Sequence, residues 1–307
     1  MSNDAFEETL KIGPEFEGLR LDQFLGHFFD QESRSYFQRL IEKNAVQLNG
    51  KTVKKRQILK NNDCVHICFE QSPEICLEAQ NIPLEILYED DDLILINKEA
   101  GMVVHPGVGN PSKTIVNALL YYCKDLPQDV GSLRPGIVHR LDKDTSGVLA
   151  LAKTKRAQME MSRYFADRKI HKEYLAIVHG NFEDQIVDAA IGRDKIHRKK
   201  MCIREDGRPA LTDCKIIARE NNYSLVKAIP KTGRTHQIRV HCQSLKAPII
   251  GDELYGSKSI NDKFKCRQML HAQKLQFQHP FTHEKICITA ALPEDFNKLL
   301  KRLFPKV

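Results

Sequence analysis

Apolar residues recur along this chain of 307 residues with two different spacings, and each change of spacing marks a change of predicted element. In residues 21–28 and 37–41, apolar side chains recur every three or four positions, which predicts two short helices. Residues 45–48 and 65–69 have the composition of short strands. A small α+β unit is therefore expected near the N-terminus.

The rest of the chain repeats this mixture on a larger scale. Short apolar runs at residues 84–88, 93–97 and 173–178 predict strands, whereas residues 114–122 and 154–165 have the spacing of helices, the second with Thr154 as its cap. Helices and strands alternate irregularly. We therefore expect an α+β fold with a large, mixed and mainly antiparallel sheet.

A polar, proline-containing segment, QSPEICLEAQNIP, separates the two predicted units at residues 71–83. The expected organisation is an N-terminal extension (residues 1–15), a small basic unit (16–76) and a large unit (77–307). No internal repeat or low-complexity tract interrupts them.

Composition limits the classes of protein to consider. Hydrophobic residues make up 41% of the chain, enough for real cores, and a net charge of +7 slightly favours a polyanionic partner. The N-terminal residues show no signal or transit peptide, and no apolar run reaches the length of a membrane span. A cytoplasmic protein without a membrane partner is expected.

Cysteine and histidine spacing argues against a metal or disulfide framework. The nine cysteines include no CxxC pair, so we expect mostly buried thiols. His139, His171, His236 and His241 fit no standard metal-site spacing. No glycine-rich nucleotide cradle is present either, so we expect neither a metal nor a cofactor.

The segment RPGIVHRLDKDTSG, residues 134–147, carries the most informative chemistry. It places one carboxylate, Asp142, among arginine, histidine and hydroxyl residues. A turn at Pro135 and Gly136 and an apolar run from Ile137 precede it, and a buried strand follows Gly147, so two core strands are expected to hold the loop. The segment is interpreted as an active-site loop. The alternative is an ordinary turn in which the aspartate caps backbone amides.

This loop resembles a known signature. Residues 139–147 match HRLDxxTSG, the signature of the pseudouridine synthases that modify ribosomal and transfer RNA. Further blocks resemble that family in the same order: VHPGVGNPSKTIVN (104–117), KEYLAIVHG (172–180), KTGRTHQIRVH (231–241) and GDELY (251–255). The resemblance covers about the whole chain after residue 80. It implies isomerisation of uridine to pseudouridine without a cofactor, and HPGVGNP is similar to members that act on large-subunit ribosomal RNA.

The resemblance also implies residue roles. Asp142 is expected to be the catalytic carboxylate, acting as a nucleophile on the sugar or as a base at C2′. Arg239 stands where the family places the arginine that pairs with this aspartate, on a helix expected to begin at Thr235. Arg234 is the alternative partner, or a phosphate contact. Tyr174 is expected to pack on the target uracil.

Basic residues suggest how RNA is held. The first unit resembles the S4 RNA-binding domain, with Asn44 and Asn62 where glycine is common. In the second unit, Arg140 is expected to occupy or read the position that a flipped nucleotide vacates. The run RDKIHRKKMCIREDGR (193–208) predicts a mobile basic hairpin. The other expected RNA contacts are Arg34, Lys51, Lys54, Lys55, Arg56, Lys199 and Lys200.

Several functions fit these observations. The favoured one is a monomeric pseudouridine synthase acting on large-subunit ribosomal RNA or on the assembling large subunit, with transfer RNA as the alternative substrate. A non-catalytic RNA-binding assembly factor and an RNA glycosidase that releases uracil are the rivals. The joint presence of Asp142, Tyr174 and Arg239 favours the synthase.

Overall fold

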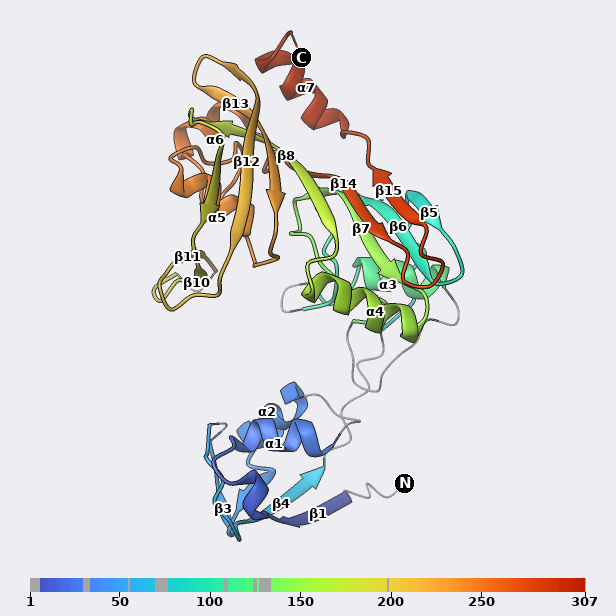
Figure 1. Ribbon diagram of the computed structural model, residues 1–307, viewed down its shortest axis with the longest axis vertical. Coiled ribbons are helices and arrows are strands. Elements are labelled where there is room, and N and C mark those ends of the chain that lie inside the picture. Colours follow the sequence, from blue (N-terminus) through green and yellow to red (C-terminus); the bar gives the residue numbers. More distant parts are fainter. Residues whose placement is uncertain are drawn as a thin grey trace. The chain divides into compact units, whose positions relative to one another are not determined.

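Two compact units make up the chain. The computed structural model describes residues 6–29, 34–54, 56–69, 77–107, 110–123, 126, 134–197 and 199–306. One unit comprises Met1–Leu77 with Gln128–Pro135, and the other comprises Glu78–Pro127 with Gly136–Val307 (Figure 1). Each unit has a hydrophobic core of its own.

The first unit packs two helices against a four-stranded antiparallel sheet with the order β1-β4-β2-β3 (Figure 1). Phe24 and Phe37 of the two helices share one core with Val65 and Ile67 of the sheet, and all four side chains are fully buried. The elements are β1 (Phe6–Lys11), the 3-10 turn η1 (Pro14–Phe16), α1 (Leu21–Phe28), α2 (Arg34–Glu42), β2 (Val46–Leu48), β3 (Lys51–Thr52) and β4 (Cys64–Phe69).

Strand β1 corrects the expected N-terminal extension. Residues 6–11 pair with β4 along their whole length, with Phe6 opposite Phe69 and Lys11 opposite Cys64. The sequence FEETLK has too few apolar side chains to be recognised as a strand from its composition. It forms a strand at the edge of the sheet through backbone hydrogen bonds to β4. The first unit therefore begins before residue 16.

Two turns of the first unit depend on left-handed backbone angles. Asn44 has φ of 61° and Asn62 has φ of 66°. Asparagine adopts this region more readily than other residues that carry a Cβ atom, so both turns form without glycine, as the sequence predicts.

The second unit is built on a nine-stranded sheet in the order β5-β6-β7-β14-β8-β13-β12-β9, with β15 added beside β14 (Figure 1). Strands β7 and β14 are parallel, and every other pair in this sheet is antiparallel. The expected mixed, mainly antiparallel α+β fold is confirmed. The strands are β5 (Ile86–Glu89), β6 (Leu93–Lys98), β7 (Ser146–Ala152), β8 (His171–His179), β9 (Gln185–Asp188), β12 (Leu211–Glu220), β13 (Tyr223–Pro230), β14 (Leu270–Gln278) and β15 (Lys285–Thr289).

Strand β7 lies in the middle of this sheet because of its composition. All seven residues of SGVLALA are buried, which is typical of a strand covered on both faces. Helix α4 packs on β7 through Ala157 and Met161, and Thr154 caps it by accepting a hydrogen bond from the Ala157 amide, as predicted. The helices are α3 (Ile115–Tyr122), α4 (Lys155–Ala166), α5 (Gln237–Ser244), α6 (Lys258–Phe264) and α7 (Glu294–Leu303), and a separate hairpin is formed by β10 (Ile191–Arg193) and β11 (Met201–Ile203).

Three local predictions are wrong. Residues 137–138 form no strand, and Ile137 makes only an isolated bridge to Leu151. Helix α5 starts one residue later than predicted, because His236 and not Thr235 is its N-cap. Most cysteines are not buried: of the eight in the described ranges, only Cys214 and Cys242 are. Among the described residues, no helix is both long and apolar enough to cross a membrane.

Candidate active site

A cavity of about 410 Å³ in the second unit brings the residues singled out from the sequence together. The signature loop contributes Arg140 and Asp142, β8 contributes Tyr174, and the segment at the start of α5 contributes Arg234 and Arg239. Strand β8 lies between β14 and β13, so two neighbouring strands fix the position of the backbone that carries Tyr174. The cavity is thus assembled from distant parts of the sequence.

A buried lysine anchors the backbone of the signature loop. The Lys98 side chain, 1% exposed, donates hydrogen bonds to the backbone oxygens of Glu99, Met102 and Lys143 at 2.7, 2.9 and 2.9 Å. Burial lowers the pKa of Lys98 to about 7. Because Lys143 follows Asp142 directly, the Lys98 amino group fixes the backbone that carries the carboxylate.

The threonine, serine and glycine of the signature hold the loop to neighbouring strands. Thr145 accepts a hydrogen bond from Gln268 at 2.6 Å, and the Ser146 hydroxyl lies 2.9 Å from Nδ1 of His271. Gly147 has φ of 111°, and a Cβ atom there would overlap the backbone of Ala272 on β14. Ser146 and Gly147 therefore permit the close approach of β7 to β14, and Thr145 ties the loop to the segment just before β14.

The first histidine of the signature is also structural. Nε2 of His139 accepts a hydrogen bond from the Ala150 amide at 2.9 Å, and the ring stacks on Phe165 with centroids 4.3 Å apart. Burial lowers the pKa of His139 to about 3, so the ring is neutral near pH 7. It ties the start of the loop to β7 and α4.

Asp142 forms a hydrogen-bonded ion pair with Arg239. Nη1 of Arg239 donates to Oδ2 of Asp142 at 2.9 Å, and the Asp142 side chain is 21% exposed. The competing arginine, Arg234, instead donates from Nε to the Pro209 carbonyl at 3.0 Å. A charge-assisted hydrogen bond of this length fixes the direction of the carboxylate.

A second aspartate holds Arg239 from behind. Asp252, fully buried, accepts hydrogen bonds from Nε and Nη2 of Arg239 at 2.7 and 2.9 Å. It also accepts from the amides of Leu254 and Tyr255. Burial alone would lower the pKa of Arg239, but the two aspartates raise it. The block GDELY was noted from the sequence, but Asp252 was given no role. Arg239 is buried and uses only Nη1 for Asp142, so a second carboxylate is needed to pair with its Nε and Nη2.

His236 lines the cavity near Asp142, and Tyr255 packs against the His236 ring. The Tyr255 hydroxyl accepts a hydrogen bond from the Met201 amide at 2.7 Å and lies 2.9 Å from Nδ1 of His236. The Tyr255 hydroxyl can either donate to Nδ1 of a neutral His236 ring or accept from it, because a phenol oxygen can accept two hydrogen bonds. Nε2 is 3.9 Å from Oδ2 of Asp142. Burial lowers the pKa of His236, which favours this neutral form.

Tyr174 and Lys172 line the cavity from β8. Burial and then the charge of Asp142 raise the pKa of Tyr174, so its hydroxyl stays protonated. Burial lowers the pKa of Lys172 to about 8, and its Nζ lies 3.4 Å from the Thr232 carbonyl oxygen. Sequence reasoning gave Lys172 no role, although it belongs to the KEY block. An ammonium group on a cavity wall can bind an anion such as phosphate.

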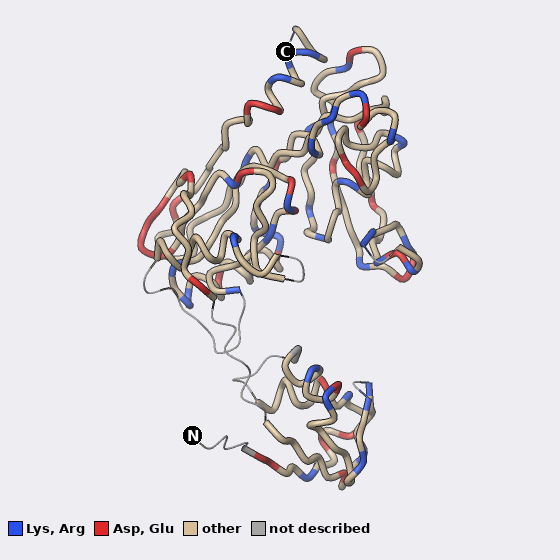
Figure 2. Tube along the Cα trace, turned by 180° about the vertical axis from the view of Figure 1, so that it is seen from behind, with Lys and Arg blue, Asp and Glu red and all other residues tan. Residues whose placement is uncertain are grey.

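The remaining basic candidates lie on exposed surfaces. Arg140 is exposed at the edge of the cavity, and Lys199, beside the half-buried Lys200, is exposed between β10 and β11. The hairpin also carries acidic residues (Figure 2), and Asp194 directly follows β10 in the sequence. In the first unit, Lys51, Lys54 and Arg56 are exposed, Arg34 begins α2, and Lys55 lies outside the described residues.

Comparisons with known proteins show the family to which the chain belongs. Residues 92–244 match the family described as RNA pseudouridylate synthase. Ribosomal large subunit pseudouridine synthase D of Xanthomonas campestris is 41% identical over 93% of this chain and 89% of that protein. The protein of the same name from Haemophilus influenzae is 41% identical over 96% of this chain and 94% of its own length.

Solved structures show the same relationship. Human RNA pseudouridylate synthase domain containing 4 superposes with a TM-score of 0.58 at 27% identity, over 71% of this chain and 92% of that one. Human RNA pseudouridylate synthase domain containing 1 has a TM-score of 0.56 at 28% identity, over 73% of this chain and 96% of that one. With relatives this similar over nearly their whole length, the chain belongs to the RNA pseudouridine synthase family.

Proposed function

We propose that this enzyme converts uridines of large-subunit ribosomal RNA to pseudouridine, with Asp142 as the catalytic carboxylate. The observation that carries the proposal is the geometry of Asp142, which is partly exposed to the cavity and held at 2.9 Å by Arg239. The ribosomal target rests on the relatives named ribosomal large subunit pseudouridine synthase D.

The reaction needs only what this cavity contains. The bond from ribose C1′ to N1 of uracil breaks, a bond from C1′ to C5 forms, and the proton on C5 is lost while N1 gains one. An ionised Asp142 serves either as the nucleophile on the sugar or as the base at C2′. Arg239 holds it in position, and Asp252 keeps Arg239 in place. Tyr174 offers its aromatic face to the uracil.

RNA capture is assigned to basic residues of both units. A stacked uridine must flip out before its C1′ is accessible, and we assign Arg140 to the vacated position and Arg234 to a phosphate. The first unit is proposed to be an S4 RNA-binding domain. The enzyme is proposed to act as a cytoplasmic monomer on the assembling large subunit. The residues proposed to contact RNA phosphates are Arg34, Lys51, Lys54, Lys55, Arg56, Lys199 and Lys200.

The proposal is tested by mapping pseudouridine on unmodified large-subunit ribosomal RNA with carbodiimide and primer extension. The wild-type enzyme should give new stops, and Asp142→Asn should give none. Asp144→Asn, in the same loop two residues away, is the matched control and should retain the stops. Stops on transfer RNA alone would reassign the substrate. Release of free uracil would support a glycosidase, and RNA binding without either product would support an assembly factor.

A further inference from the structure

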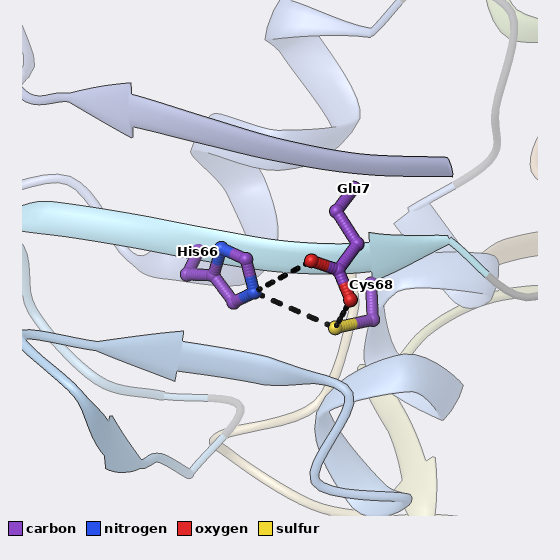
Figure 3. A group of neighbouring side chains, drawn as sticks. All are labelled: Glu7, His66 and Cys68. Atoms are coloured by element: carbon purple, nitrogen blue, oxygen red, sulfur yellow. Dashed lines mark hydrogen bonds and ion pairs between the residues drawn. The ribbon is translucent and has the colours of Figure 1, made fainter. Parts of the chain in front are cut away.

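A separate group of metal-ligating side chains lies on the sheet of the first unit (Figure 3). Side chains of a strand alternate between its two faces, so His66 and Cys68 of β4 share the face opposite the buried Val65 and Ile67. In the antiparallel register of β1 and β4, Glu7 stands opposite Cys68. The register therefore brings three different ligand types to one point.

The donor atoms lie close enough together to share one ion, with one carboxylate oxygen of Glu7 near the sulfur and the other near the imidazole. Sγ of Cys68 is 3.6 Å from Nε2 of His66 and 3.4 Å from Oε1 of Glu7, and Nε2 of His66 is 3.7 Å from Oε2 of Glu7. Usual zinc bond lengths to sulfur, nitrogen and oxygen give tetrahedral edges of about 3.3–3.6 Å. A zinc ion would fit between these atoms with shifts of a few tenths of an ångström.

The surroundings of His66 favour the same use. Thr9 stands opposite His66 on β1, and its hydroxyl lies 3.0 Å from Nδ1 of the ring. A hydrogen bond at one ring nitrogen orients the other toward a metal, as partners of zinc-binding histidines commonly do. Thiolate, imidazole and carboxylate together are a donor set suited to zinc rather than to magnesium or calcium.

We propose that Glu7, His66 and Cys68 bind one zinc ion, with water in the fourth position. On binding, the Cys68 thiol loses its proton to the solvent, and a sulfur–zinc bond replaces the sulfur–hydrogen bond. The ion would fasten the edge strand β1 to β4 and so stabilise the first unit. This proposal concerns the first unit alone and does not depend on the reaction proposed for the second.

Cobalt, which adopts the geometry of zinc and absorbs light, provides the test. The full-length, metal-free protein is titrated with Co²⁺ while its absorption spectrum is recorded. We expect a thiolate-to-cobalt charge-transfer band and the visible bands of tetrahedral cobalt, saturating at one equivalent and abolished by Zn²⁺. Zn²⁺ should also raise the melting temperature.

Variants separate this site from adventitious binding to other thiols. Cys68→Ser should abolish the charge-transfer band, whereas Cys64→Ser, which alters an exposed thiol of the same strand, should retain it. Thr9→Val should weaken binding about 10–100-fold. The proposal is overturned if the wild type shows no such band, or if Cys64→Ser removes it as completely as Cys68→Ser. Circular dichroism of each metal-free variant checks that it is folded.

Discussion

Replacing Asp252 with asparagine would measure how much the buried aspartate contributes to the site. The change keeps the shape of the side chain but removes its charge and places an amide donor near a guanidinium donor. Arg239, itself only 6% exposed, then keeps Asp142 as its sole charged partner among the described residues. Leaving a buried charge without its partner costs about 3–5 kcal/mol of unfolding free energy.

The chain offers a matched control for this change. Arg267 donates from Nε and Nη2 to Asp295 at 2.7 and 3.1 Å, nearly the geometry of the Arg239–Asp252 pair. The Asp295 side chain is 46% exposed, whereas that of Asp252 is fully buried. Solvent screens an exposed pair, so Asp295→Asn should cost at most about 1 kcal/mol. The difference between the two variants therefore isolates the effect of burial.

Urea denaturation followed by circular dichroism provides the unfolding free energies, and pseudouridine formation provides kcat/KM. Asp252→Asn should lower kcat/KM by about 100-fold in the fraction that remains folded, because Arg239 no longer aims Asp142. Asp295→Asn should leave it unchanged. Equal destabilisation by the two substitutions would refute the reasoning, because buried and exposed pairs would then contribute alike.

Other changes test other parts of the fold. Gly147→Ala should lower the unfolding free energy in urea by at least about 1–3 kcal/mol, because both φ and the Ala272 backbone exclude a Cβ atom. Gly107→Ala, where a Cβ atom would meet open space, should change it little. Tyr255→Phe should cost about 1–3 kcal/mol by leaving the Met201 amide without its acceptor, and an unchanged melting temperature would contradict that bond. Burial lowers the pKa of His271 to about 4 from 6.5, so the unfolded chain binds more protons between these values and stability should fall as pH falls from 6.5 toward 4. Melting temperatures of His271→Gln across this range should fall less steeply than those of the wild type.

Several predictions that rested on local patterns were accurate. The cap at Thr154 and the left-handed turns at Asn44 and Asn62 depend on a few neighbouring residues, which the sequence displays directly. The start of α5 shows the limit. Thr235 has the side chain of a good cap, but the contact between His236 and Tyr255 accompanies a left-handed His236 at that position.

Long-range pairing accounts for most of what could not be predicted. Strand β1 is too polar to be recognised without β4, and the parallel contact of β7 with β14 joins residues 125 positions apart, as in the pair Ser146 and His271. The pairing of Arg239 with Asp142 was expected only from the family resemblance. The sequence alone left Arg234 as an alternative partner, which the structure places against the Pro209 carbonyl instead. No periodicity along one segment carries such information.

The contacts of the signature loop change what the motif means for identifying relatives. Its threonine, serine and glycine contact Gln268, just before β14, and His271 and Ala272 on β14. A descendant that had lost Asp142 would still need them in order to fold. A search that scores the whole motif would therefore also find inactive descendants. If Asp142 is the catalytic group proposed above, the aspartate and its partner Arg239 are the positions that would separate enzymes from such descendants.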